Sequence, residues 1–150
     1  MTMVQTHLWF ESKAEEAMKF YTSVFKDSKV LGSTQLPDSM AVFRFELAGM
    51  PITALNAGSR RPFNEAVSLY VETEDQAETD YYWDALRTGG GAEQPCGWLT
   101  DRFGVFWQVT PKALLRLLGD PDKQKVDRVL QAMYKMKKII VADLERAYRG

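Results

Sequence analysis

Cysteine and histidine are nearly absent from this chain, which has one residue of each among its 150 residues. The single cysteine, Cys96, excludes a disulfide within the chain and a zinc site built from several cysteines, which fits a reducing compartment. No apolar run approaches the length of a membrane span, and residues 1–10 lack the basic and apolar parts of a secretory signal. We therefore expect a soluble cytoplasmic protein that does not associate with a membrane.

An excess of positive charge is also missing. The formal net charge is −1, and the lysine and arginine residues are scattered along the chain. A nucleic-acid-binding protein normally carries a basic patch, so we expect no nucleic-acid partner. With 45% apolar residues, the chain can form one globular domain, residues 1–150, that buries roughly two-thirds of its unfolded surface.

A duplicated pattern is the most informative feature that the sequence contains. In each copy an apolar strand end is followed by a hydroxyl residue, then by Glu or Gln, then by an aromatic pair: Phe10, Ser12, Glu15 and Phe20-Tyr21, and again Val71, Thr73, Gln76 and Tyr81-Tyr82. This spacing is that of a capping box at the start of an amphipathic helix. We predict that Ser12 and Thr73 cap two helices and that the two copies are equivalent modules.

The sequence pattern around each helix predicts strands. In the first module, apolar alternation and turn residues predict strands at 4–10, 29–36, 40–47 and 51–56, with a helix that ends near residue 26. In the second module they predict strands at 66–72, 93–100 and 104–110, and the glycines 89–91 end the helix. The predicted fold is α+β, with paired βαβββ modules at residues 1–60 and 61–111 and a C-terminal helical extension at residues 112–150.

Several of these segments together resemble one known family. The resemblance is carried by Leu8-Trp9-Phe10, Ala54-Leu55-Asn56, Phe63 to Ser68, Trp83 to Leu86, Cys96 to Leu99, Asp101 to Gly104, Trp107 to Val109 and Met136-Lys137-Lys138. These segments resemble the PhnB-like proteins, often labelled 3-demethylubiquinone methyltransferases, of the glyoxalase, bleomycin-resistance and extradiol-dioxygenase (vicinal oxygen chelate) superfamily. The resemblance implies curved mixed sheets around a cup, commonly in a homodimer.

The resemblance also identifies where a metal would bind. Metal-dependent members of the superfamily hold a divalent ion with four side chains that project into the cup, and alignment by strands and turns places these positions at Gln5, Ala54, Ala66 and Gln108. Alanine has no lone pair to donate, and neutral amides leave the charge of a divalent cation uncompensated. His7 shares the face of Gln5, but one imidazole does not complete the set. We expect no metal and no cofactor.

The cup could still bind a ligand without a metal. Strand periodicity places a mixture of polar and aromatic side chains on the inward side: Gln5, His7, Trp9, Ala54, Asn56, Ser68, Tyr70, Phe106 and Gln108. Small-molecule pockets typically contain such a mixture. The candidate catalytic residues are His7, which could carry a proton, and Tyr70, which could help to position a substrate.

Other candidates have two interpretations each. Arg44 could be the positive charge that binds an anionic or carbonyl-bearing ligand, or it could lie at an edge and pair with Glu46 or solvent. Asn64 could bind a ligand at the rim of the cup, or it could fix its own turn. Burial in the structure is favoured for Cys96, and a salt bridge within a turn is favoured for Asp101-Arg102.

Two functions remain in competition. The first is a metal-independent small-molecule-binding protein that acts by sequestration or sensing, as bleomycin-resistance relatives do. The alternative is a lyase, isomerase or oxygenase of the same superfamily acting on a small carbonyl, quinone or phosphonate-like substrate, so whether the protein is an enzyme stays open. The methyltransferase label has no support, because no strand leads through a glycine-rich turn into a helix. We expect a homodimer, because the helices after Pro111 carry more apolar surface than one short sheet needs.

Overall fold

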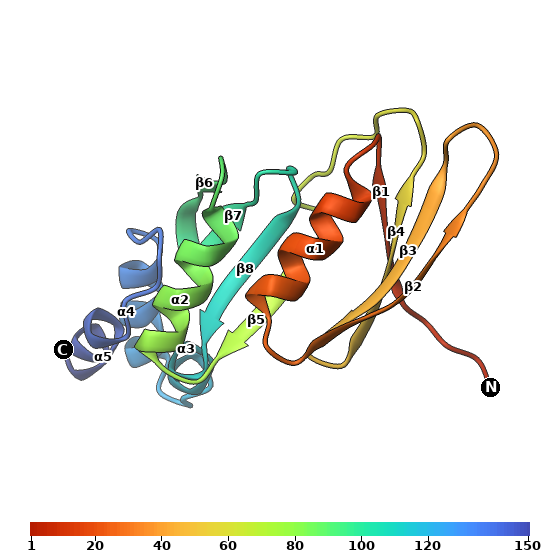
Figure 1. Cartoon of the computed structure of the whole chain (residues 1–150). Coiled ribbons are helices and arrows are strands. Elements are labelled where there is room, and N and C mark those ends of the chain that lie inside the picture. Colours follow the sequence, from red (N-terminus) through yellow and green to blue (C-terminus); the bar gives the residue numbers. More distant parts are fainter. The chain divides into compact units, whose positions relative to one another are not determined.

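The computed structural model describes residues 1–150, which divide into two compact units, Met1–Pro62 and Phe63–Gly150. Each unit contains one four-stranded sheet with a helix against one face of it (Figure 1). The boundary between the units falls near the predicted module boundary, and the predicted C-terminal extension belongs to the second unit. The prediction that residues 1–150 form a single domain stays a prediction.

The first unit has the predicted βαβββ order. It comprises β1 (Thr6–Phe10), α1 (Ala14–Val24), β2 (Ser28–Gln35), β3 (Ala41–Leu47) and β4 (Met50–Asn56), and the spatial order of the strands is β1-β4-β3-β2. Strand β1 runs parallel to β4, and the remaining pairs are antiparallel. The parallel pair is possible because α1 provides the crossover connection that parallel strands require.

The core of the first unit lies between α1 and one face of its sheet. Residues alternate along β3, where Phe43 and Phe45 are buried while Arg44 between them is exposed. The buried stripe of α1, which includes Met18 and Tyr21, packs against these strands. Burial of each large apolar side chain contributes about 1.5–3 kcal/mol, so this face determines the register of the sheet. The opposite face carries more exposed residues, such as Arg44 of β3 and His7 of β1.

The second unit repeats this topology. It comprises β5 (Leu69–Thr73), α2 (Gln76–Arg87), β6 (Ala92–Glu93), the short 3-10 helix η1 (Pro95–Gly97), β7 (Trp98–Thr100) and β8 (Phe106–Pro111), with strand order β5-β8-β7-β6. The predicted strand at 66–72 begins later, at Leu69, and Val67 before it is 73% exposed. The predicted strand at 93–100 is interrupted by η1, in which Cys96 has a φ of 64°.

Both predicted capping boxes are wrong, although the helices themselves are confirmed. The first turn of α1 is capped from a distant strand, because the Ala14 amide donates to Asn56 Oδ1 at 2.7 Å. The cap of α2 is Asp75, whose carboxylate accepts from the Glu78 amide at 2.9 Å. Thr73 is fully buried instead, with its hydroxyl 2.6 Å from that of Thr79. Each helix begins later than the Ser-x-x-Glu or Thr-x-x-Gln spacing indicates.

The C-terminal extension forms three helices, α3 (Lys112–Leu118), α4 (Lys123–Met133) and α5 (Val141–Arg149). Their apolar stripes are buried in a shared core composed of Leu114, Leu117, Val129, Ile139 and Leu144. This burial uses the apolar surface on which we based the expectation of a homodimer, so that argument fails and the dimer stays a prediction. No helix of the chain is long and apolar enough to cross a membrane.

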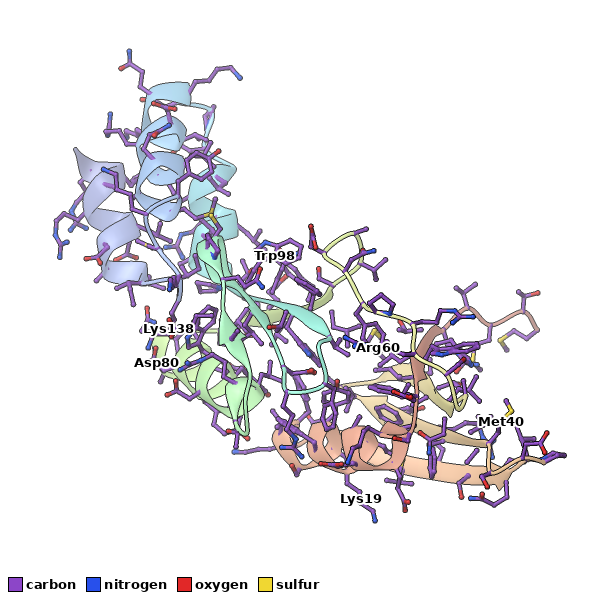
Figure 2. The ribbon with its side chains drawn as sticks, turned by 90° about the horizontal axis from the view of Figure 1, so that it is seen from above. Lys19, Met40, Arg60, Asp80, Trp98 and Lys138 are labelled. Atoms are coloured by element: carbon purple, nitrogen blue, oxygen red, sulfur yellow. The ribbon has the colours of Figure 1, made fainter.

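Side chains of α2 hold this extension in place. Gln76 donates through Nε2 to the Ile139 carbonyl at 3.0 Å and accepts through Oε1 from the Val141 amide at 2.8 Å. Lys138 forms an ion pair with Asp80 at 2.8 Å, and the two side chains lie side by side in Figure 2. The extension is therefore part of the second unit, because backbone groups of the extension form hydrogen bonds with the Gln76 side chain of α2.

Candidate functional site

The far face of the first sheet, meaning the face opposite α1, brings together two predicted site residues, His7 and Arg44, and one that was not predicted, Thr53. His7 of β1 lies opposite Thr53 of β4, and Thr53 lies opposite Arg44 of β3. Side chains at directly paired positions point to the same face of a sheet. His7, Thr53 and Arg44 therefore form one row across three neighbouring strands, which we call the polar row.

An apolar row lies beside the polar row on the same face. Trp9 is opposite Leu55, and Leu55 is opposite Val42. The segment that follows β4 reaches Trp9, whose Nε1 donates to the Ser59 carbonyl at 2.7 Å, and the Arg61 guanidinium lies 5.3 Å from the ring centroid. Figure 2 labels Arg60 in this segment. The two rows place an apolar surface next to polar and cationic groups.

The members of the polar row differ in how they are paired. Thr53 is nearly buried, and its hydroxyl lies 3.2 Å from Gln5 Oε1, to which it donates. The exposed Arg44 side chain donates to Thr34 Oγ1 at 3.2 Å and forms no ion pair, because Glu46 pairs with Lys29. The exposed His7 makes no hydrogen bond or ion pair. The pairing of Arg44 with Glu46 that we considered does not form, and β3 is an inner strand.

Two residues predicted to face the cup lie on the opposite side of the first sheet. Ala54 is opposite Leu8 on the face covered by α1 and is fully buried. Asn56 is opposite Phe10 on that same face, where it caps α1. The predicted orientation of both residues is wrong by one position along the strand, and this slip exchanges the two faces. Thr53, which the sequence reasoning missed, occupies the far face instead.

The second sheet brings together four predicted residues on the face opposite α2. Tyr70 of β5 lies opposite Gln108 of β8, and Phe106 lies two residues before Gln108. Gln108 Nε2 donates to Ser68 Oγ at 2.9 Å. Trp98 of β7 is also opposite Gln108, so it belongs to this face, although the sequence reasoning did not select it. The sequence reasoning missed Trp98 because it treated residues 93–100 as one continuous strand, whereas η1 interrupts that strand and β7 begins at Trp98.

The remaining candidates serve the local backbone. Asn64 accepts from the Ala66 amide at 2.9 Å and so fixes its own turn, outside any strand. Asp101 is 3% exposed and accepts from the amides of Phe103 and Val105, at 2.9 and 3.1 Å, and from Trp107 Nε1 at 2.9 Å. A carboxylate with three such donors organises the turn before β8 and does more than the surface salt bridge that we expected. Cys96 is only partly buried, contrary to expectation.

Comparison with known proteins identifies the family. A family model described as 3-demethylubiquinone-9 3-methyltransferase matches residues 2–110. The chain belongs to this family. The three helices from Lys112 onward lie outside the matched region, and a search of curated proteins finds no match.

Solved structures agree with this assignment. The PhnB protein from Bacillus cereus is 31% identical, with 73% of this chain and 99% of that chain covered and a TM-score of 0.66. Protein PA1353 from Pseudomonas aeruginosa is 20% identical over 74% and 98% of the two chains, with a TM-score of 0.62. The fosfomycin resistance protein FosX from Listeria monocytogenes, complexed with Mn(II) and sulfate, is 14% identical over 71% and 88%, with a TM-score of 0.56. PhnB and FosX have the vicinal oxygen chelate fold, so the predicted fold class is confirmed.

The metal positions of the superfamily are poorly matched in this family member. Ala54 lies on the covered face, and Ala66 lies in a turn before β5. Within either unit, no three His, Cys, Asp or Glu side chains gather where they could hold an ion. Since Gln5 and Gln108 are neutral amides, the donor set of each unit does not fit a divalent cation, and we assign no chemical step to one.

The shifted pKa values of this family member lie outside the two far faces. Hydrogen bonds from Lys138 and Gln76 lower the pKa of Asp80 below its ordinary value. The hydrogen bond from the Tyr148 hydroxyl lowers the pKa of Asp120 and raises that of Tyr148. All five residues attach the C-terminal helices or join them to one another, so these shifts report on stability and not on catalysis.

Proposed function

We propose that this member of the 3-demethylubiquinone-9 3-methyltransferase family binds a small organic molecule without a metal ion. The proposal rests on the far face of the second sheet. There Gln108 is hydrogen-bonded to Ser68 and lies between Tyr70 and Trp98 on the neighbouring strands. Binding sites for small molecules typically combine apolar and aromatic walls with a few placed polar groups. This face has that composition.

The chemistry of the face suggests the ligand class. Gln108 uses one N–H for Ser68, which leaves its carbonyl oxygen and a second N–H for a ligand. Tyr70, which is 47% exposed, adds a hydroxyl on the adjacent strand. Trp98 and Phe106 supply ring surfaces on which a planar molecule could stack. A small aromatic carbonyl compound or a quinone fits these groups.

The metal-independent part of the proposal rests on the donor set. Within either unit, no three His, Cys, Asp or Glu side chains gather where they could hold an ion, and Gln5 and Gln108 are neutral amides. Elemental analysis of protein purified without added metal and dialysed should find less than one equivalent of zinc, nickel, manganese or iron. One equivalent retained through dialysis would contradict the proposal.

Ligand binding can be tested by thermal shift with acetophenone and short-chain quinones. A ligand at 100 times its dissociation constant stabilises a protein by about 2.7 kcal/mol. Gln108→Leu and Tyr70→Phe should reduce the shift, whereas Glu72→Gln should not, because Glu72 lies two residues beyond Tyr70 on the same face and is exposed. If the first two variants bind every active compound as tightly as the original protein, the far face of the second sheet is not the site.

An enzymatic function is the second candidate, as a lyase, isomerase or oxygenase acting on a similar small molecule. It is favoured by His7, an exposed imidazole without a hydrogen-bonding partner that could transfer a proton. If a compound identified by thermal shift is turned over, His7→Ala should abolish turnover. We do not propose methyl transfer, since the glycines 89–91 follow α2 and do not open a helix.

We also propose a homodimer, because members of this superfamily commonly pair. Light scattering on the full chain should give twice the monomer mass of 17.1 kDa. A strictly monomeric mass at the concentrations used for binding would contradict this proposal without affecting the others.

A further inference from the structure

We infer that the polar row of the first sheet is an anion-binding site, in which Arg44, Thr53 and His7 hold a carboxylate, phosphonate or phosphate group. The inference goes beyond the proposed function, because it places a second kind of ligand on the first sheet. It does not depend on the residues of the second sheet that carry that proposal. The anion would be the charged group of a small molecule and not a surface counterion, for the reasons that follow.

The spacing of the row suits a small oxyanion. Neighbouring strands lie about 4.8 Å apart, so Arg44 and His7 flank Thr53 with their backbones roughly 10 Å from each other. Thr53 has a short side chain, whereas the two outer residues are long enough to lean over it. Guanidinium, imidazole and hydroxyl groups can all donate hydrogen bonds to an oxyanion, and arginine can do so through two bonds at once.

Gly32 on β2 makes room for the guanidinium. It is the fourth position of the row, opposite Arg44, and it follows a register shift between Val30 and Gly32. A Cβ at Gly32 would lie 3.3 Å from Arg44 Nη2, which is tighter than ordinary van der Waals contact. Its φ of 153° is also a conformation that other residues rarely adopt. The irregularity in β2 and the missing side chain both leave space around Arg44, and such bulges often re-aim side chains near functional sites.

The charge of Arg44 is uncompensated, in contrast to that of its neighbour. Lys29 lies on the same face and is paired with Glu46 at 3.3 Å. Arg44 donates one of its five N–H groups to Thr34 Oγ1 and has no carboxylate partner. One cation of this face is thus neutralised within the sheet, and the other is available to an external anion.

The adjacent apolar row determines what the rest of the ligand would be. Trp9, Leu55 and Val42 lie two residues along each strand from the polar row, a distance of roughly 7 Å. An anion bound over Thr53 would therefore place its organic part against the Trp9 ring and the Leu55 side chain. The ligand class is a small anion with an apolar or aromatic body.

Titration of the full chain with three probes tests this inference. The probes are phenylphosphonate, benzoate and benzamide, the last being a neutral molecule of nearly the same shape as benzoate. Isothermal titration and amide chemical shifts should show binding of the two anions, with benzamide at least about ten-fold weaker, as expected for the loss of a charge-assisted hydrogen bond. The amides of β1, β3 and β4 should shift.

Two variants and their controls separate the charge from the fold. Arg44→Gln should weaken phenylphosphonate binding at least about ten-fold, whereas Lys19→Gln, which removes a cation of α1 that is paired with Glu15, should leave it unchanged. Gly32→Ala should also weaken binding by displacing the guanidinium. Its control is Gly49→Ala, a change at a φ of 84° with no atom within 4 Å of the new Cβ, which strains the backbone without touching Arg44. Circular dichroism checks that each variant is folded.

The results overturn the inference in any of three cases. These are the absence of phenylphosphonate binding at millimolar concentration, equal binding of benzamide and benzoate, and an equal loss in Lys19→Gln and Arg44→Gln. The proposed function fails separately, when acetophenone binding is insensitive to Gln108→Leu. Phenylphosphonate binding that needs Arg44 but not Gln108 would support the anion site and leave the role of the second sheet to the acetophenone test.

Discussion

Replacement of Asn56 with alanine should destabilise the first unit, because α1 receives its N-terminal cap from this residue of β4. The first amide of α1, at Ala14, donates to Asn56 Oδ1 at 2.7 Å in a part-buried environment. The first four amides of a helix have no partner within the helix, so the loss of an external acceptor leaves one of them unsatisfied. No other side-chain cap is present, since the N-cap residue Lys13 makes no such bond.

The expected cost follows from this geometry. Loss of a capping side chain costs about 1 kcal/mol, and a part-buried donor left without a partner raises the cost toward about 2 kcal/mol. For a folding unit of this size, each 1 kcal/mol lowers the melting temperature by about 4–8 °C. Urea unfolding followed by the loss of the native amide NMR signals of Met1–Pro62 measures the change within this unit.

Two further variants make the test specific. Asn56→Asp keeps an acceptor at the same place and puts a negative charge at the helix N-terminus, so it should retain most of the stability. Ser12→Ala should change the free energy of unfolding by less than about 0.5 kcal/mol, because Ser12 is exposed and makes no cap. A larger loss in Ser12→Ala than in Asn56→Ala would refute the reasoning and restore the capping box that the sequence suggests.

Three other perturbations address the second unit. Gln76→Ala should lower its free energy of unfolding by about 2 kcal/mol, measured by urea unfolding, because two backbone groups of the C-terminal extension lose their partner. Asp80 has a lowered pKa, so its stabilisation is fully present above its ordinary pKa of 3.8 and is lost as the pH falls through the lower folded value. Melting curves from pH 6 to 2 should show this loss, and Lys138→Gln should reduce it; an unchanged pH profile in that variant would contradict the assignment. Asp101→Asn should cost about 3 kcal/mol, since one of its oxygens would become an amide nitrogen facing N–H donors, and a calorimetric melting temperature within 2 °C of the original would be too small for this account.

The duplicated architecture could be predicted because it depends on short-range patterns. Alternation along β3 and the apolar stripe of α1 are each visible within about ten residues, and burial of these residues fixes the elements. The helix caps could not be predicted in the same way. A capping box is a local motif, but Asn56 reaches α1 from a strand that lies far along the chain, and nothing near Ala14 indicates it.

The candidate sites could be predicted only in part, because the alternation of buried and exposed residues is clear on some strands and unclear on others. On the second sheet, alternation correctly grouped Ser68, Tyr70, Phe106 and Gln108 on one face, because β5 and β8 are paired without a register shift. On β4 the assignment slipped by one residue, since Ile52, Thr53 and Ala54 are all nearly buried and offer no clear alternation. A slip of one position replaced Thr53 with Ala54 and hid the polar row that the pairing of β1, β4 and β3 reveals.

The bonds that Gln76 makes to the extension have a consequence for synthesis on the ribosome. Every strand of the first unit precedes Phe63, so its sheet can be completed while the rest of the chain is still being translated. Helix α2 is made soon afterwards, but the Val141 amide and the Ile139 carbonyl that Gln76 binds are among the last residues to be translated. The second unit must therefore wait for nearly the whole chain to leave the exit tunnel, and a prematurely terminated chain would carry a finished first unit and an unfinished second one.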